Sequence, residues 1–198
     1  MPIACATALA LASCGGDRQD KGEPKGNYKV EVVSASFPEK QKLAKTSSLR
    51  IVVRNADDKT IPNIAVTVSG FDVRRDDPDL ADPDRPIFVI NGRPKNIGGF
   101  PESKEAAPPG CETTYVNTWA CGPLKPGRQK EFKWTVTAVR AGDFTLRYVV
   151  AAGLNGKAKA IDDQGGGRPL GVFHGTVDDK PPQTRVADDG HTVVNGTR

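Results

Sequence analysis

Histidine is scarce in this chain, since only His174 and His191 occur among 198 residues. A Ser–His–Asp site needs a histidine as its base, but His174 ends a weakly patterned strand and His191 lies in a polar segment. No serine stands in a Gly-x-Ser-x-Gly motif, and the HExxH and P-loop motifs are also absent. A pair of carboxylates for glycoside hydrolysis would not be visible as a sequence motif. Nothing in the sequence points to such a pair. We therefore predict a protein that is not an enzyme and has no cofactor.

Long apolar runs and basic clusters are missing too. Beyond the N-terminal segment, no stretch approaches the ~20 apolar residues that a membrane span requires. The net charge of +4 is small, its charges are mixed in sign, and there is no run of Lys and Arg interleaved with aromatic residues. Nucleic acid is therefore not an expected partner. The hydrophobic share of 37%, with 21 Gly and 16 Pro, favours a loop-rich β protein with disordered ends.

The chain begins with an apolar segment. Residues 3–12 are Ala, Leu, Ile and Cys apart from Thr7, without the basic residues that open a secretory signal. The run Leu11-Ala12-Ser13-Cys14-Gly15-Gly16 resembles the lipobox of bacterial lipoproteins. That resemblance implies cleavage before Cys14, a lipid on its sulfur, and a truncated signal segment over residues 1–13. The alternative is an Ala-rich disordered tail that happens to contain cysteine.

Polar segments flank the rest of the chain. Residues 15–27, GGDRQDKGEPKGN, have too little apolar surface to offset their ordering entropy by burial. Together with Cys14 they form a predicted flexible tether over residues 14–27. Residues 177–198 form a predicted polar C-terminal tail, in which Asp189-Gly190 suits either the turn of a small hairpin or a disordered segment.

Apolar and polar residues alternate along five segments, which predicts strands with one face on a core and the other in water. The segments are Tyr28–Val32, Leu49–Arg54, Ile64–Ser69, Phe132–Thr137 and Phe144–Val150. Weaker strands are predicted at Ile87–Ile90 and Gly171–Phe173, and the only helical candidate is a short segment at Glu39–Leu43. Several short strands separated by turn residues predict an all-β antiparallel β-sandwich over residues 28–176.

Two sequence patterns resemble bacterial immunoglobulin-like domains of cell-surface proteins, with the cell-adhesion-related CARDB domain as the nearest type. The first pattern is a strand that ends in Val-x-Asn, followed by a turn and a Val-rich strand, at Leu49–Val68. The second is Leu-x-Pro-Gly before two strands joined by a Gly-containing turn, at Leu124–Val150. The resemblance implies an immunoglobulin-like sandwich, but such folds host many functions. The segment 72–121 is longer than a sandwich loop requires, which predicts a long irregular insert.

Two of the four cysteines, Cys111 and Cys121, lie in the predicted domain. Outside the cytoplasm, a pair so close in sequence is most simply a disulfide, worth roughly 3 kcal/mol in the chain-entropy model. The alternative is two free buried thiols. A metal site is less favoured, because neither histidine is close in sequence.

The insert carries two candidate sites. The first is a carboxylate cluster that has the oxygen ligands calcium prefers: Asp76, Asp77, Asp79, Asp82 and Asp84. It lacks the EF-hand pattern, and the alternative is a solvated loop whose acids pair with neighbouring arginines. The second is a ligand groove lined by Tyr115 and Trp119, whose rings suit carbohydrate or peptide contacts. The alternative is that these two aromatic residues cap the core beside the disulfide.

Together these features predict an extracytoplasmic surface protein, anchored by lipid at the cell surface or the periplasmic face, with a structural, adhesive or protein-binding role. Its expected partners are the membrane, through the lipid anchor, and other cell-envelope proteins or glycans. The alternative is a solute- or glycan-binding lipoprotein that uses the 72–121 insert. An envelope hydrolase is the least favoured function.

Overall fold

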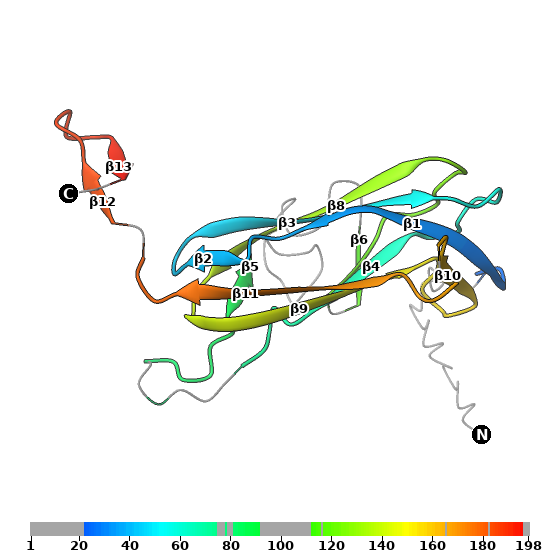
Figure 1. Ribbon diagram of the computed structural model, residues 1–198, viewed down its shortest axis with the longest axis horizontal. Coiled ribbons are helices and arrows are strands. Elements are labelled where there is room, and N and C mark those ends of the chain that lie inside the picture. The colour runs from blue at the N-terminus through cyan, green and yellow to red at the C-terminus, as the bar shows by residue number, and fades with distance from the viewer. Residues whose placement is uncertain are drawn as a thin grey trace, which may run out of the picture.

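The computed structural model describes residues 22–74, 78, 81–91, 112–115, 117–164, 166–181 and 183–195. These residues form two β-sheets that lie face to face, which confirms the predicted all-β immunoglobulin-like sandwich (Figure 1). They include no helix that is long and apolar enough to cross a membrane. The strands are β1 (Gly26–Ser36), β2 (Lys40–Lys42), β3 (Thr46–Asn55), β4 (Ala65–Ser69), β5 (Phe88–Ile90), β6 (Glu112–Tyr115), β7 (Thr118–Ala120), β8 (Gln129–Ala138), β9 (Gly142–Ala151), β10 (Ala158–Asp162), β11 (Leu170–Asp178), β12 (Thr184–Val186) and β13 (Val193–Asn195).

The first sheet has the strand order β10-β1-β3-β8-β5, and the second has the order β2-β11-β9-β4-β7-β6. Strands β12 and β13 pair with each other in a separate hairpin. Most neighbours are antiparallel, as predicted, but the β1–β10 and β2–β11 pairs are parallel. Side-chain alternation sets which face of a strand is buried and carries no information on the direction of its neighbour.

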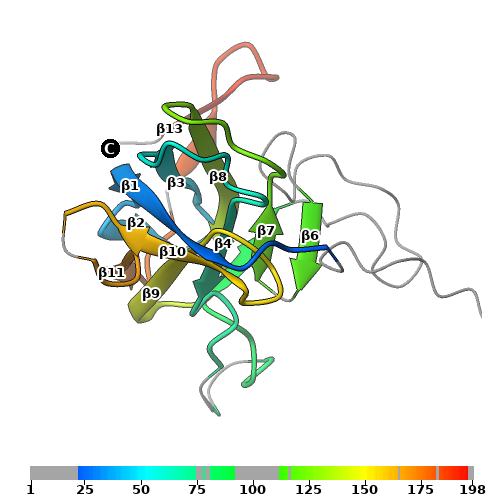
Figure 2. The same ribbon diagram turned by 90° about the vertical axis from the view of Figure 1, so that its right-hand side faces the viewer.

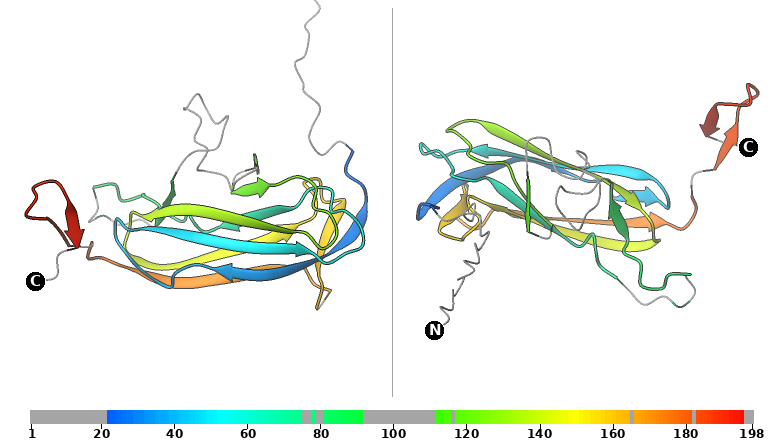
Figure 3. Two further views of the ribbon diagram at one scale, coloured as in Figure 1. Left: turned by 90° about the horizontal axis from the view of Figure 1, so that it is seen from above. Right: turned by 180° about the vertical axis from the view of Figure 1, so that it is seen from behind.

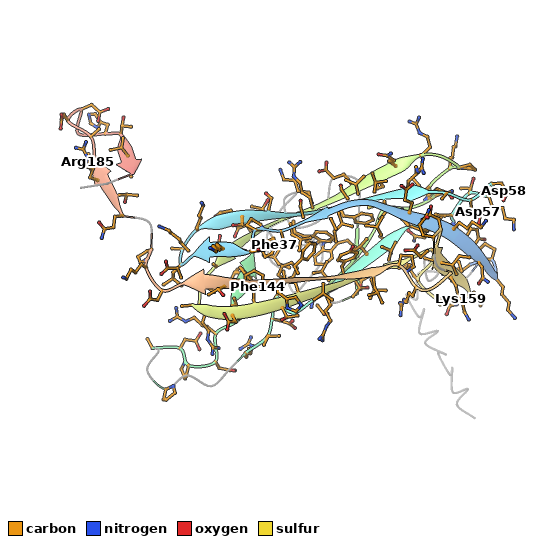
Figure 4. All side chains as sticks on the ribbon, viewed as in Figure 1. Phe37, Asp57, Asp58, Phe144, Lys159 and Arg185 are labelled. Carbon is orange, nitrogen blue, oxygen red and sulfur yellow. The ribbon has the colours of Figure 1, made fainter. Side chains whose placement is uncertain are left out.

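Aromatic residues join the two sheets. Trp134 of β8, in the first sheet, is fully buried and meets Trp119 of β7, in the second sheet, edge to face with ring centroids 5.1 Å apart. Phe37, Phe88 and Phe144 continue this aromatic core, with centroid separations of 5.1–5.5 Å (Figure 4). The strands predicted from alternation therefore bury the residues that the pattern placed on the inner face.

The helical candidate at Glu39–Leu43 is wrong, because Lys40–Lys42 forms strand β2 beside β11. Only Gln41 of these three residues is buried, and its side-chain amide donates to the carbonyl of Pro38. The segment is too short to show a period of its own, so its pairing partner decides its conformation. Strand β10 was not predicted either, and it pairs with the first residues of β1. Figure 2, which looks at this end of the sandwich, shows the two strands side by side.

Asn55 explains why the two motifs of the CARDB resemblance occur together. It ends β3 with no exposed surface, and its side-chain amide donates to the carbonyls of Lys59 (2.8 Å) and Leu124 (2.7 Å). Its side-chain oxygen accepts from the amide of Asp57, and its backbone carbonyl accepts from that of Gly127. The asparagine of the first motif thus holds the Leu-x-Pro-Gly turn of the second, which makes both motifs structural.

Strand β11 has a weak sequence pattern because two of its inward positions are glycine. A Cβ atom at Gly171 would collide with the ring of Tyr148, and one at Gly175 would collide with Phe144 and the backbone of Glu39. Phe173, between them, packs against the core and lies 5.6 Å from Tyr148, centroid to centroid. The glycines thus make room for β9 side chains and for the entry of β2.

Candidate strand-pairing site

The part of the chain that the structure describes leaves one side of β11 unpaired over most of its length. On that side, β2 pairs only with Thr176–Asp178. On the other side, β9 pairs with β11 from Leu170 to Val177. Among the described residues, Leu170–Gly175 therefore have no strand beside them on the β2 side. We call this segment the open edge of β11.

The hydrogen-bond pattern shows which backbone groups point outward at the open edge. Pro169 accepts a hydrogen bond from the amide of Val150 in β9, and Thr176 donates to the carbonyl of Glu39 on the opposite side. Bonding alternates along an antiparallel pair, so the odd-numbered residues face β9. The N–H and C=O groups of Leu170, Val172 and His174 therefore point away from β9, as a row that a further strand can pair with.

Apolar side chains accompany this row. Leu170 and Val172 are 60% and 42% exposed, although both lie within a strand. Phe173 and Val32, which belong to different sheets, are only partly buried where they pack against the core. A groove of about 700 Å³ passes over this part of β11, and its lining includes Phe37, Val172 and Phe173. An extended segment placed here would gain both backbone hydrogen bonds and apolar contacts, as in β-strand addition.

Two short strands limit the open edge. Strand β2 lies beside the C-terminal end of β11, and β10 lies beside the N-terminal end of β1 in the other sheet (Figure 1). Beyond its pairing with β10 at Gly26–Val30, β1 also lacks a strand on that side among the described residues. Val33, at a register shift of β1, is 43% exposed. On this side of the sandwich, β10 thus covers the N-terminal end of β1 and β2 covers the C-terminal end of β11. The open edge is the part of β11 that neither strand covers.

The polar residues beside the open edge are paired locally. His174 Nδ1 and the Thr145 hydroxyl are 3.1 Å apart, and the Thr176 hydroxyl donates to Asp143 at 2.6 Å. The histidine and the aspartate thus bond to different threonines across the β9–β11 pair. Among the described residues, no group of three or more His, Cys, Asp or Glu side chains is placed to hold a metal.

The structure describes only part of the predicted calcium cluster, since Asp76, Asp77 and Asp79 lie outside the described residues. The Asp84 carboxylate pairs with Arg74 at 3.2 Å, with both side chains more than half exposed. The backbone carbonyl of Asp82 accepts from the amide of Arg85. This described part matches the alternative of a solvated loop with local ion pairs.

Trp119 does not line a surface groove. It is 2% exposed and contacts Trp134 between the sheets, which matches the alternative that it belongs to the core. Sequence could not decide this, because the burial of Trp119 depends on the pairing of β7 with β4. The side chain of Tyr115 and the residues Cys14 and Cys111 lie outside the described part of the chain, so their roles, including the Cys111–Cys121 disulfide, stay predictions.

Glu23, in the predicted tether, holds the start of the domain in a way that the sequence did not suggest. Its carboxylate accepts four backbone N–H bonds of 2.6–2.8 Å, from Leu154, Asn155, Lys157 and Ala158. A Cβ atom at Gly153 would collide with this carboxylate. Glu23, near the end of the predicted tether, is therefore attached to the β9–β10 loop before β1 begins, and composition alone gave no sign of this.

Lowering the pH should release Glu23 from this loop. Burial alone raises the pKa of Glu23, but the N–H donors of Ala158, Asn155, Leu154 and Lys157 together hold it below its ordinary value of 4.5. The attachment is thus fully present above pH 4.5 and is lost as the pH falls through the lowered pKa. Amide chemical shifts of Leu154 and Lys157 should follow this titration. The Glu23→Gln variant should show no such titration, and an unchanged titration in that variant would refute this assignment.

The strand order and the two facing sheets define an immunoglobulin-like β-sandwich domain. No known family's sequence profile matches the chain, and neither does any curated protein. Among solved structures, a CARDB domain from Pyrococcus furiosus, in complex with di-metal ions, is similar with a TM-score of 0.45 and 13% identity, over 78% of this chain and 92% of that one. A CARDB domain, the type that the two sequence patterns resemble, is thus among the solved structures to which the chain is similar.

Two further similar structures come from other proteins. Escherichia coli alpha-2-macroglobulin matches with a TM-score of 0.42 and 15% identity, over 79% of this chain but only 7% of that one. The PapD-like domain 7 of human CEP192 matches with a TM-score of 0.40 and 13% identity, over 91% of this chain and 100% of that one. At these identities the likeness is one of fold.

Proposed function

We propose that this protein is a lipid-anchored, extracytoplasmic binding module that pairs with an extended segment of another cell-envelope protein along the open edge of β11. The observation that carries the proposal is the outward row of backbone groups at Leu170, Val172 and His174, next to apolar side chains that are exposed or partly exposed. Natural proteins usually cover or charge such edges because they invite pairing. The role is adhesive or structural and involves no catalysis.

The layout of the chain supports an anchored module. The lipobox-like run at Cys14 precedes the tether, and the tether joins the domain where Glu23 is held by the β9–β10 loop. Strand β11 ends at the opposite end of the sandwich from the start of β1 (Figure 3). A domain held at its β1 end would leave the open edge accessible along its side.

Val172→Pro tests the edge. Proline removes the outward N–H of Val172 and no bond to β9, so the edge strand tolerates it. Losing that one backbone hydrogen bond to a partner, at about 1 kcal/mol, weakens binding roughly fivefold, and the proline ring also hinders the approach of the partner's carbonyl. Affinity capture from solubilised envelope, quantified by mass spectrometry, should lose a defined partner in this variant and keep it in Val172→Thr, which retains the N–H. Equal capture by both variants would refute the proposal.

The same preparations test the anchor. Cys14→Ala should move the protein from the membrane fraction to the soluble fraction. Membrane retention equal to that of the unaltered protein would show that Cys14 carries no anchor.

A further inference from the structure

The C-terminal hairpin of β12 and β13 lies apart from the sandwich. Figures 1 and 3 show it beyond the end of β11, clear of both sheets. A two-stranded hairpin on its own is at best marginally stable in water, because it has no core to pack on. This hairpin therefore lacks the surface that such an element needs.

The turn of the hairpin is nonetheless well formed. The Asp189 carboxylate accepts from the hydroxyl of Thr192 and from the amides of Thr192 (2.8 Å) and His191 (2.9 Å), and these bonds hold its pKa below the ordinary range. Gly190 supplies the positive φ of +73° that the turn requires, and its amide donates to Ala187. The segment is thus a defined structural element that lacks only a surface to pack on.

The hairpin also has an apolar pair on one face. Val186 and Val193 lie directly opposite each other in the β12–β13 pairing and are 55% and 65% exposed. Both strands keep an unpaired outer side among the described residues. These are the features that a partner for the open edge of β11 needs: a strand with free backbone groups and a small apolar surface.

We propose that the hairpin of one copy of this chain pairs with the open edge of β11 in a second copy. This inference rests on the proposed function, since it names the occupant of the same edge. Docking within one copy is disfavoured because β2 covers the last residues of β11, next to the point where the linker to the hairpin begins. The sequence of the linker also contains Pro181-Pro182, and consecutive prolines favour an extended conformation.

Such an interface is head-to-tail, because the hairpin and the open edge are different surfaces of one chain. Repetition of a head-to-tail contact gives rings or open filaments rather than only dimers. Copies joined in this way would form an extended layer along the surface to which they are anchored. The interaction is therefore homotypic adhesion or assembly.

Sedimentation velocity of the full chain carrying Cys14→Ala tests the inference. Protein concentrations up to about 1 mM allow weak contacts to be detected. The protein should form oligomers that grow with concentration. Val172→Pro blocks the edge, and the pair Val186→Lys with Val193→Glu removes the apolar face while opposite charges preserve cross-strand pairing. Each of these two variants alone should stay monomeric.

Mixing the two variants gives the decisive result. The edge-blocked protein still carries an intact hairpin and the hairpin-altered protein still carries an intact edge, so an equimolar mixture should form dimers and nothing larger. A monomeric parent protein, or a hairpin-altered protein that still forms oligomers, would overturn the inference. If envelope capture still depends on the Val172 N–H in that case, the proposed function stands with another partner. If capture of envelope proteins is also unaffected by Val172→Pro, both the proposed function and the inference about the hairpin are wrong.

Discussion

Asn55→Asp should lower the free energy of unfolding by about 2–5 kcal/mol, although it changes one NH₂ group into an oxygen. The side-chain amide of the buried Asn55 donates to the carbonyls of Lys59 and Leu124, and the bond to Leu124 is itself buried. A carboxylate in its place points an acceptor at two other acceptors and carries a buried charge without a partner. Urea denaturation of the variant and the unaltered protein measures the difference.

Asn63→Asp is the matched control. Asn63 is only partly buried and uses its side-chain oxygen to accept from the amide of Gly122 at 2.9 Å. Aspartate keeps that acceptor, so the same chemical change should cost under about 1 kcal/mol there. Equal losses at the two positions would contradict the role assigned to the Asn55 amide.

Trp134→Ala should lower the free energy of unfolding by about 3–5 kcal/mol. Trp134 is fully buried, stacks on Phe132 of its own sheet, and meets Trp119 of the other sheet edge to face. Its removal leaves a cavity where the two sheets contact each other. Thermal or urea unfolding followed by circular dichroism measures the loss.

Trp134→Phe separates the aromatic contacts from the indole nitrogen. That nitrogen is buried and has no hydrogen-bond partner among the described residues, so phenylalanine removes a group that gains nothing from burial. We expect this variant to lose less than half as much stability as Trp134→Ala. A loss below about 1 kcal/mol for Trp134→Ala would show that the two sheets do not depend on this contact.

The sandwich could be predicted because its central strands alternate strictly. In β8, Phe132, Trp134 and Val136 are all buried, as their spacing requires. Strands at the margins carry weaker signals. Strand β2 has the sequence Lys-Gln-Lys and β11 has glycine at two inward positions, so neither shows a regular apolar period. Their conformation comes from neighbours that are distant in sequence.

The candidate site depends on strand order, which alternation does not contain. The row at Leu170, Val172 and His174 is open only because β2 stops at the last residues of β11. Aromatic residues were a poor guide by comparison, since Trp119 faces the core. A partial signal was present in Leu170 and Val172, which are apolar at the outward positions of a strand. Identifying those positions as outward requires the pairing with β9.

Photo-cross-linking in intact cells tests the strand-pairing function most directly. A photoreactive amino acid replaces Val172 at the open edge, and in a separate strain it replaces Lys133, which lies on the outer face of the first sheet within β8. The proposed function predicts discrete cross-linked products from position 172 and none from position 133. A product with the mass of two copies would identify the partner as the chain itself. No product from position 172, or the same products from both positions, would contradict the claim that the open edge of β11 binds a partner.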